Sequence, residues 1–266
     1  MNQRKILIGS NWKMNKTVSE AISYTRRLLQ EIELLAGLDQ LQIFVIPPYT
    51  AIAAVKHESG GRLWVGAQNM HWAESGAYTG EISAPMLKEL GVDLVELGHA
   101  ERRQHFGETD ATINRKLLMA LRFGLRALIC IGEQLEHKVS GVERESVARQ
   151  LRAILAGVPA REASKLILAY EPVWAIGEDG TTADPHYVRV MCNYIRDVVI
   201  EAFGLDLARQ VRVIYGGDVK SSNAAEILEQ GNVDGLFIGR AAWQAEGFAS
   251  LIRACLEPFA PGTRVY

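Results

Sequence analysis

Eight short apolar runs alternate with longer amphipathic stretches along the whole chain, and this alternation limits the possible folds most strongly. The runs predict strands at 5–10, 42–47, 63–67, 94–98, 127–131, 166–170, 211–215 and 235–238. The stretches between and after them predict helices at 18–35, 50–57, 84–90, 111–123, 142–155, 185–202, 221–229 and 243–256. Eight strand-then-helix units favour the α/β class and a closed (β/α)8 barrel with its helices outside.

The main alternative is an open doubly wound sheet. Such a sheet normally carries a glycine-rich nucleotide motif after its first strand. The corresponding segment here, Gly9-Ser-Asn-Trp-Lys13, does not match that motif. Because no linker or low-complexity segment interrupts the series, residues 1–266 are expected to form one domain.

Composition excludes several classes of function. The chain has 266 residues, 48% of them hydrophobic, and a net charge of -2, which predicts neither nucleic acid nor an anionic membrane as a partner. The three cysteines, Cys130, Cys192 and Cys255, are far apart and lack metal-ligand spacing. They fit buried thiols in a reducing compartment. The N-terminus has no apolar stretch long enough for a signal peptide or a membrane span, so we expect a cytoplasmic protein.

A carboxylate ends the sixth expected strand. Glu171 follows the apolar run 166–170 and precedes Pro172, which cannot donate to a sheet ladder. An apolar patch, two glycines and the helix-starting pair Asp184-Pro185 come next. This segment predicts a lid beside an acid, although an ordinary surface loop would look similar.

Other polar or glycine-rich residues also follow the expected strands. In a closed barrel all these positions lie at one rim, where barrel enzymes place their chemistry. Any one of them alone is more often a solvated strand end, but together they indicate a site. They are Asn11 and Lys13 after the first strand, His99 and Glu101 after the fourth, Glu171 after the sixth, Gly216 and Gly217 after the seventh, and Gly239 and Arg240 after the eighth.

These residue types suggest a division of labour. Paired glycines let backbone N–H groups approach a phosphate, and loops after the seventh and eighth strands of a barrel commonly bind one. Glu171 would become a stronger base when the lid excludes water, while His99 and Lys13 could stabilise an oxyanion. This set predicts proton abstraction next to a carbonyl of a small phosphorylated substrate, and aldose–ketose isomerisation between C1 and C2 is the simplest such reaction. No cofactor or metal is expected.

The chain resembles the triosephosphate isomerase family almost from end to end. The resemblance rests on long blocks: Gly9-Ser-Asn-Trp-Lys-Met-Asn15, Ala67-Gln-Asn-Met70, Gly76-Ala-Tyr-Thr-Gly-Glu-Ile82, Leu97-Gly-His-Ala-Glu-Arg-Arg103, Cys130-Ile-Gly-Glu133, Ala169-Tyr-Glu-Pro-Val-Trp-Ala-Ile-Gly177 and Ile214-Tyr-Gly-Gly217. It implies a TIM barrel.

The same resemblance implies roles for individual residues. Glu171 would be the base, His99 a neutral electrophile, Lys13 an electrostatic clamp, Asn11 a substrate contact and Glu101 a supporting acid. Backbone groups of Gly177, Gly217 and Gly239 would hold the phosphate. The resemblance also implies a homodimer in which the segment around Thr79 reaches over the partner's Asn11 and the partner's Lys13.

Four departures from the family pattern surround the same pocket. Ala100 stands where the family usually has serine, Asp218 replaces the serine after the glycine pair, and Arg240 replaces a second glycine. The lid from Gly177 to Pro185 is one residue longer, more acidic and without its usual lysine. Asp218 and Arg240 could form an ion pair, or Arg240 could grip the phosphate.

These departures leave three hypotheses. The favoured one is isomerisation of a four-carbon substrate of the erythrulose phosphate type, as in the breakdown of tetritols. The second is triosephosphate isomerase activity itself, and the third is a barrel that binds phosphorylated metabolites without turning them over. Retention of Glu171, His99 and Lys13 argues against the third.

Overall fold

The computed structural model describes residues 4–177, 180–229 and 232–256, and these form a closed eight-stranded parallel barrel. The strands follow chain order around the barrel, and β1 pairs with both β2 and β8 to close it. Their bounds are β1 Ile6–Asn11, β2 Leu41–Ile46, β3 Trp64–Ala67, β4 Leu94–Leu97, β5 Arg126–Ile131, β6 Leu166–Tyr170, β7 Arg212–Tyr215 and β8 Gly235–Ile238. The predicted (β/α)8 barrel is confirmed.

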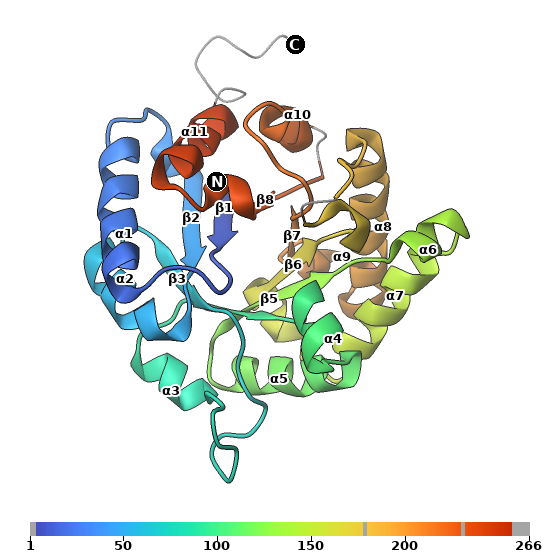
Figure 1. Ribbon diagram of the computed structural model, residues 1–266. Coiled ribbons are helices and arrows are strands. Elements are labelled where there is room, and N and C mark those ends of the chain that lie inside the picture. Colours follow the sequence, from blue (N-terminus) through green and yellow to red (C-terminus); the bar gives the residue numbers. More distant parts are fainter. Residues whose placement is uncertain (1–3, 178–179, 230–231, 257–266) are drawn as a thin grey trace.

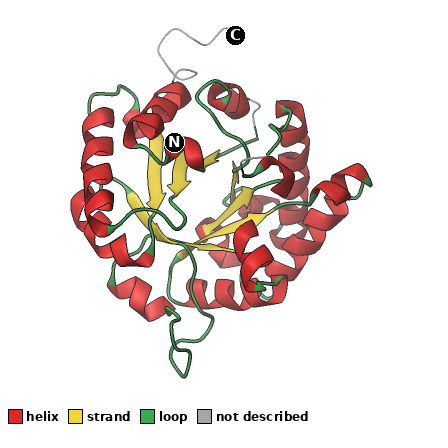
Figure 2. Cartoon of the chain, in the orientation of Figure 1, coloured by secondary structure: helices red, strands yellow, loops and turns green. Residues whose placement is uncertain are grey.

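Helices form a ring outside the strands, as Figures 1 and 2 show. The α-helices are α1 Val18–Ile32, α2 Ile52–Ser59, α3 Ala84–Glu89, α4 Ala100–Phe106, α5 Asp110–Arg122, α6 Leu135–Val139, α7 Glu143–Ile154, α8 Pro185–Phe203, α9 Leu205–Ala208, α10 Ala224–Glu229 and α11 Ala245–Leu256. Eight of them correspond to the predicted helices. Their amphipathic faces bury apolar side chains against the outside of the barrel, as α1 does with Leu28 and Ile32.

Three short helices, α4, α6 and α9, were not predicted. Each has seven residues or fewer and buries at most one of them, so no apolar face marks the helix in the sequence. The fourth strand also ends one residue earlier than expected, at Leu97. Gly98 has φ +77°, a left-handed conformation that glycine adopts easily and that leaves the extended strand. The chain turns there, so His99 is placed at the start of α4.

The inside of the barrel is packed rather than hollow. Phe44 and Phe237 stack with ring centroids 5.7 Å apart. Gly9 makes room for them, since a Cβ atom at that position would lie 2.1 Å from the Phe44 ring. The packed interior supports the strand ends, where functional residues of such barrels lie.

One long loop projects beyond the ring of helices. It connects β3 to α3 and contains Tyr78 and Thr79, which are both exposed (Figure 1). The loop is held together by stacking of His71 on Trp72 and on Tyr78, each pair with centroids 4.1 Å apart. Among the described residues, no helix combines the length and apolarity needed to cross a membrane.

Candidate active site

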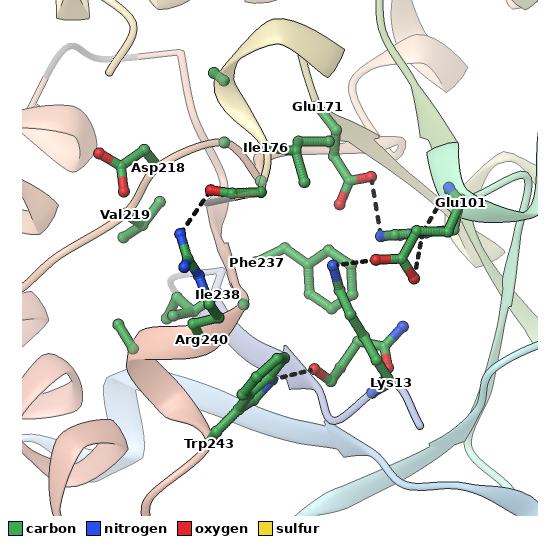
Figure 3. Close-up of a pocket in the computed structure, with 18 of the residues that line it drawn as sticks. Lys13, Glu101, Glu171, Ile176, Asp218, Val219, Phe237, Ile238, Arg240 and Trp243 are labelled. Atoms are coloured by element: carbon green, nitrogen blue, oxygen red, sulfur yellow. Dashed lines mark hydrogen bonds and ion pairs between the residues drawn. The ribbon is translucent and has the colours of Figure 1, made fainter. Parts of the chain in front are cut away.

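A cavity of about 560 Å³ opens at the carboxyl ends of the strands. Figure 3 shows its walls: Glu171, Glu101 and Lys13 on one side, and Asp218, Val219 and Arg240 on the other. All eleven residues predicted from the sequence lie around it: Asn11, Lys13, His99, Glu101, Glu171, Gly177, Gly216, Gly217, Asp218, Gly239 and Arg240. The parallel barrel brings them together because every strand delivers its carboxyl end to the same rim.

Glu171 is the most deeply placed carboxyl group of the cavity wall. Its side chain is 5% exposed, and its Oε2 lies 3.9 Å from His99 Nε2. Within the described part of the chain, Oε2 has no hydrogen-bond partner. Burial raises the pKa of Glu171 to about 8, against a smaller lowering effect of Lys13. A carboxylate that is poorly solvated and unsatisfied can act as a strong base.

Two glycines make room for Glu171. A Cβ atom at Gly132 would lie 1.9 Å from the Glu171 carbonyl oxygen, and one at Gly216 would lie 2.7 Å from its Cγ. The N–H of Gly216 donates to the Tyr170 carbonyl oxygen at 2.9 Å. Gly216, which also lines the cavity, therefore has a packing and sheet-bonding role, and its N–H is bonded to Tyr170.

His99 is held as a neutral imidazole. It caps the start of α4, where its Nδ1 accepts the backbone N–H of Glu101 at 3.2 Å. The ring proton is therefore on Nε2, the nitrogen that faces Glu171. Burial and the positive charge of Lys13 lower the pKa of His99 to about 4. As a neutral imidazole, His99 can donate a hydrogen bond from its Nε2–H into the cavity, and it carries no additional proton that Glu171 could take up first.

Lys13 enters the cavity from a strained turn. Its backbone has φ +53°, which is uncommon for a residue with a side chain. The turn is fixed because the Lys13 N–H donates to Asn11 Oδ1 at 2.6 Å and Gln68 Nε2 donates to the Lys13 carbonyl at 2.8 Å. The Lys13 ammonium then pairs with Glu101 Oε1 at 2.6 Å. Glu101 thus orients the cation beside His99.

The root of the lid is fixed by a buried acid. Glu133 is fully buried and accepts hydrogen bonds from Tyr170, Trp174 and Tyr187 at 2.8–3.1 Å. A short 3₁₀ helix, Val173–Ala175, continues from this anchor. At the other end of the lid, Asp184 caps α8 and Pro185 occupies its first turn, as predicted. Two of the predicted lid residues, Glu178 and Asp179, lie outside the described residues.

Both charged departures from the family pattern contact the lid. Arg240 Nη2 donates to the Gly177 carbonyl at 2.6 Å. Asp218 accepts from Thr182 at 2.5 Å and from Lys220 at 2.7 Å. Burial alone would raise the pKa of Asp218, but these bonds outweigh it and hold the pKa below its usual value. Asp218 is therefore a carboxylate whose charge is balanced locally.

Sequence reasoning missed several residues of the site. Lys220 and Trp243 line the cavity, and the Trp243 indole N–H donates to the Asn11 carbonyl at 3.3 Å. Glu96 lies beneath the cavity and bonds to Asn11. A single acid inside the apolar strand 94–97 was a signal that could have identified it. In the described ranges there is no group of three or more His, Cys, Asp or Glu side chains that could hold a metal ion.

Comparison with known proteins agrees with this geometry. The sequence profile described as triosephosphate isomerase matches residues 6–255. An L-erythrulose-1-phosphate isomerase from Mesorhizobium japonicum is 47% identical, covering 92% of this chain and 95% of that protein. A triosephosphate isomerase from Alkaliphilus oremlandii is 43% identical, covering 94% and 99%. The crystal structure of the Bartonella henselae triosephosphate isomerase superimposes with a TM-score of 0.83 at 35% identity, covering 94% and 99%. The chain belongs to the triosephosphate isomerase family.

Proposed function

We propose that this isomerase acts on a four-carbon ketose phosphate and that Glu171 is its base. One observation carries the assignment of the base: the unsatisfied Oε2 of Glu171 lies 3.9 Å from His99 Nε2 across a single cavity. A substrate carbon beside Oε2 would place its neighbouring carbonyl oxygen near the Nε2–H. Proton removal and oxyanion stabilisation then occur on adjacent atoms, as an enediolate intermediate requires.

The other polar residues stabilise the charge that develops. Lys13 supplies a positive charge whose position is set by Glu101, and Asn11 presents an amide fixed by two hydrogen bonds. His99 donates as a neutral imidazole, and triosephosphate isomerase is itself a standard example of such pKa tuning. These groups act on the transition state, where negative charge grows on the carbonyl oxygen.

The phosphate binds at the β7–β8 side of the cavity. Gly217 and Gly239 supply backbone there, and Arg240 adds a guanidinium group next to the lid. A charge-assisted contact from arginine is stronger than a neutral one and can be bidentate. Arg240 can therefore anchor a phosphate while the sugar end of the substrate varies.

The four-carbon substrate differs from dihydroxyacetone phosphate by one hydroxymethyl group. In an erythrulose 1-phosphate the ketone is at C2, and the proton next to it that can move is on C3. Removal of that proton gives a 2,3-enediolate, and protonation of C2 then leaves the ketone at C3. The product is again a ketose, and its phosphate-bearing carbon becomes C4 when the chain is renumbered. With this substrate the proton therefore moves between C2 and C3, in place of the C1–C2 exchange between an aldose and a ketose that the sequence suggested. The reacting atoms match those of the triose reaction. Ala100, which follows His99 at the start of α4, lacks the hydroxyl group usual at that position; it does not itself line the cavity, so its effect on the additional carbon would act through His99.

Triosephosphate isomerase activity is the second candidate. It is favoured by the 43% identity to the Alkaliphilus oremlandii enzyme and by the retention of Glu171, His99 and Lys13. Both reactions exchange a carbon-bound hydrogen with solvent, so deuterium incorporation from heavy water tests the base in either case. We expect deuterium on the carbon that was C2 of L-erythrulose 1-phosphate, which lies next to the phosphate-bearing carbon of the product, and none with Glu171→Gln. Absence of deuterium incorporation by the wild-type enzyme would contradict the assignment of Glu171 as the base.

The active unit is proposed to be a homodimer. The projecting loop carries Tyr78, which is 45% exposed, and Met14 beside the catalytic lysine is 96% exposed. Large apolar side chains in such positions are typical of protein interfaces. In the proposed dimer, the Thr79 segment of one copy covers Met14 and Lys13 of the other.

A further inference from the structure

Glu96 is a carboxylic acid inside the barrel, where an apolar residue would be expected. It lies on β4 with no exposed surface, and Leu94 on the same strand and Cys130 on β5 belong to the apolar interior. Barrel interiors are normally filled by branched apolar side chains. Burying a carboxyl group costs free energy even when it is hydrogen-bonded. Such a departure from the packing rule commonly marks a functional residue.

The contacts of Glu96 lead to the cavity. Its Oε2 accepts from Asn11 Nδ2 at 2.6 Å. The Asn11 amide oxygen is already bonded to the N–H of Lys13, so the two bonds together fix the orientation of the amide. Because the amide is planar and is held at both its nitrogen and its oxygen, its second N–H points in a fixed direction before any substrate binds. Without Glu96, Asn11 could rotate away from the reacting oxygen.

Cys130 connects Glu96 to the base. Its thiol lies 3.5 Å from Glu96 Oε1 and also contacts Glu171. Burial raises the pKa of Glu96 well above its usual value, and the Glu171 carboxylate raises it further. The hydrogen bond from Cys130 and the charge of Lys13 oppose this rise, and Glu101 adds to it. Two carboxyl groups in one desolvated space do not both ionise readily. Because the Glu171 carboxylate raises the pKa of Glu96, Glu96 holds its proton more firmly once Glu171 has lost its own.

We propose that Glu96 is a positioning residue that, as a neutral acid, fixes the Asn11 amide and, through Cys130, the carboxylate of Glu171. In the structure the Cys130 thiol donates to Glu96 Oε1 and Asn11 donates to Oε2. A neutral Glu96 would keep the bond from Asn11 and reverse the other, donating from Oε1 to the Cys130 sulfur. This role rests on the proposed proton transfer but is independent of the number of carbons in the substrate.

Two substitutions separate this role from simple packing. Glu96→Leu removes both hydrogen bonds from the interior, and we expect an unchanged or higher Tm with kcat lowered by up to about a hundredfold. Glu96→Gln keeps an acceptor for Asn11 and a donor for Cys130, so it should recover most of the lost rate. Leu94→Met, on the same strand and inside the same barrel, is the packing control and should leave kcat near that of the wild type.

The pH profile tests the neutral state. If Glu96 is uncharged, Glu96→Gln should not shift the pH midpoint of the acid limb in the profile of kcat/KM against pH. A midpoint moved to lower pH would show that Glu96 carried a negative charge, and would overturn the proposal. Wild-type kcat in Glu96→Leu would also overturn it.

Infrared spectroscopy gives a measurement that needs no substrate. A protonated carboxyl band at neutral pH that disappears in Glu96→Gln supports the proposal, and the absence of such a band overturns it. The infrared measurement uses only the wild type and Glu96→Gln, so it decides the question even if Glu96→Leu does not fold. Failure of the wild type to turn over either sugar phosphate would count against the proposed function alone.

Discussion

The two sides of the cavity differ in burial and in how closely they follow the family pattern. On the β1–β4–β6 side, Asn11, His99 and Glu171 are each less than 10% exposed. Burial is the main cause of the shifted pKa values of His99 and Glu171. On the β7–β8 side, Arg240 and Lys220 are exposed and Asp218 is half-buried. The first side carries the residues that we propose to react, whereas Asp218 and Arg240, two of the four departures, lie on the second.

This difference separates the reaction from the choice of substrate. Groups that move protons need a dry, fixed environment, because their pKa values depend on it. Groups that hold a phosphate can be replaced by other donors without disturbing the chemistry. We therefore expect substitutions on the buried side to lower kcat, and substitutions on the exposed side to act through KM.

The largest effect is expected at Glu171. Glu171→Gln keeps the size of the side chain and removes the base, so kcat should fall by at least roughly 10²–10⁴-fold. Steady-state kinetics with each sugar phosphate measures this. The circular dichroism spectrum should not change, because the amide fits the same space. A Gln variant with near-normal kcat would remove Glu171 from the mechanism.

Assembly is expected to have the next largest effect. Thr79→Arg places a charge in the proposed interface, so the dimer should dissociate and activity should fall with it. Sedimentation equilibrium measures the mass, and the activity of the same sample is recorded. Ala153→Arg, on the exposed face of α7, is the matched control and should remain dimeric. A fully active monomer would refute the interface.

On the exposed side, Arg240→Gly removes the guanidinium group and restores the residue usual in the family. A hydrogen bond to a charged group contributes about 1.5–3 kcal/mol, which corresponds to roughly a tenfold to hundredfold loss in kcat/KM. The loss should appear mainly as a higher KM for both substrates. A loss confined to kcat would show that Arg240 acts in the chemical step, as we propose for the residues of the buried side.

The two sides should also differ in how pH affects stability. The folded state binds the Glu171 proton more tightly than the unfolded state does, since burial raises its pKa from 4.5 to about 8. That carboxyl group therefore favours folding below pH 4.5, and its contribution is lost as pH rises through about 8. Asp218 has a lowered pKa, so its contribution is present above pH 3.8 and lost as pH falls below that value.

Thermal unfolding at a series of pH values checks both signs. Glu171→Gln should reduce the decline in Tm between pH 4.5 and 8, whereas Asp218→Asn should lower Tm above pH 3.8 and leave it near the wild-type value at the acid end. Identical profiles of Tm against pH for the wild type and Glu171→Gln would contradict the raised pKa of Glu171.

Sequence patterns predicted the strands well because each buried parallel strand is a continuous apolar run. The sixth and eighth strands have the predicted bounds, and the others shift by about one residue. The rim residues also followed from the barrel, since strand ends converge. The pattern could not reveal contacts between loops. The hydrogen bonds of Arg240 with Gly177 and of Asp218 with Thr182 each join segments that are far apart in the sequence. Glu96 was missed although it is the single acid in an otherwise apolar strand, because it lies before the strand end where functional residues were expected.

The most direct test of the substrate assignment compares two substrates on one preparation at one pH and salt concentration. The measurement is kcat/KM for L-erythrulose 1-phosphate and for dihydroxyacetone phosphate. A missing substrate carbon leaves part of the pocket unfilled, which costs about 1–3 kcal/mol. We therefore predict a higher kcat/KM for the four-carbon substrate. A tenfold or greater preference for dihydroxyacetone phosphate would show that the chain is a triosephosphate isomerase in which Ala100, Asp218 and Arg240 do not select the substrate.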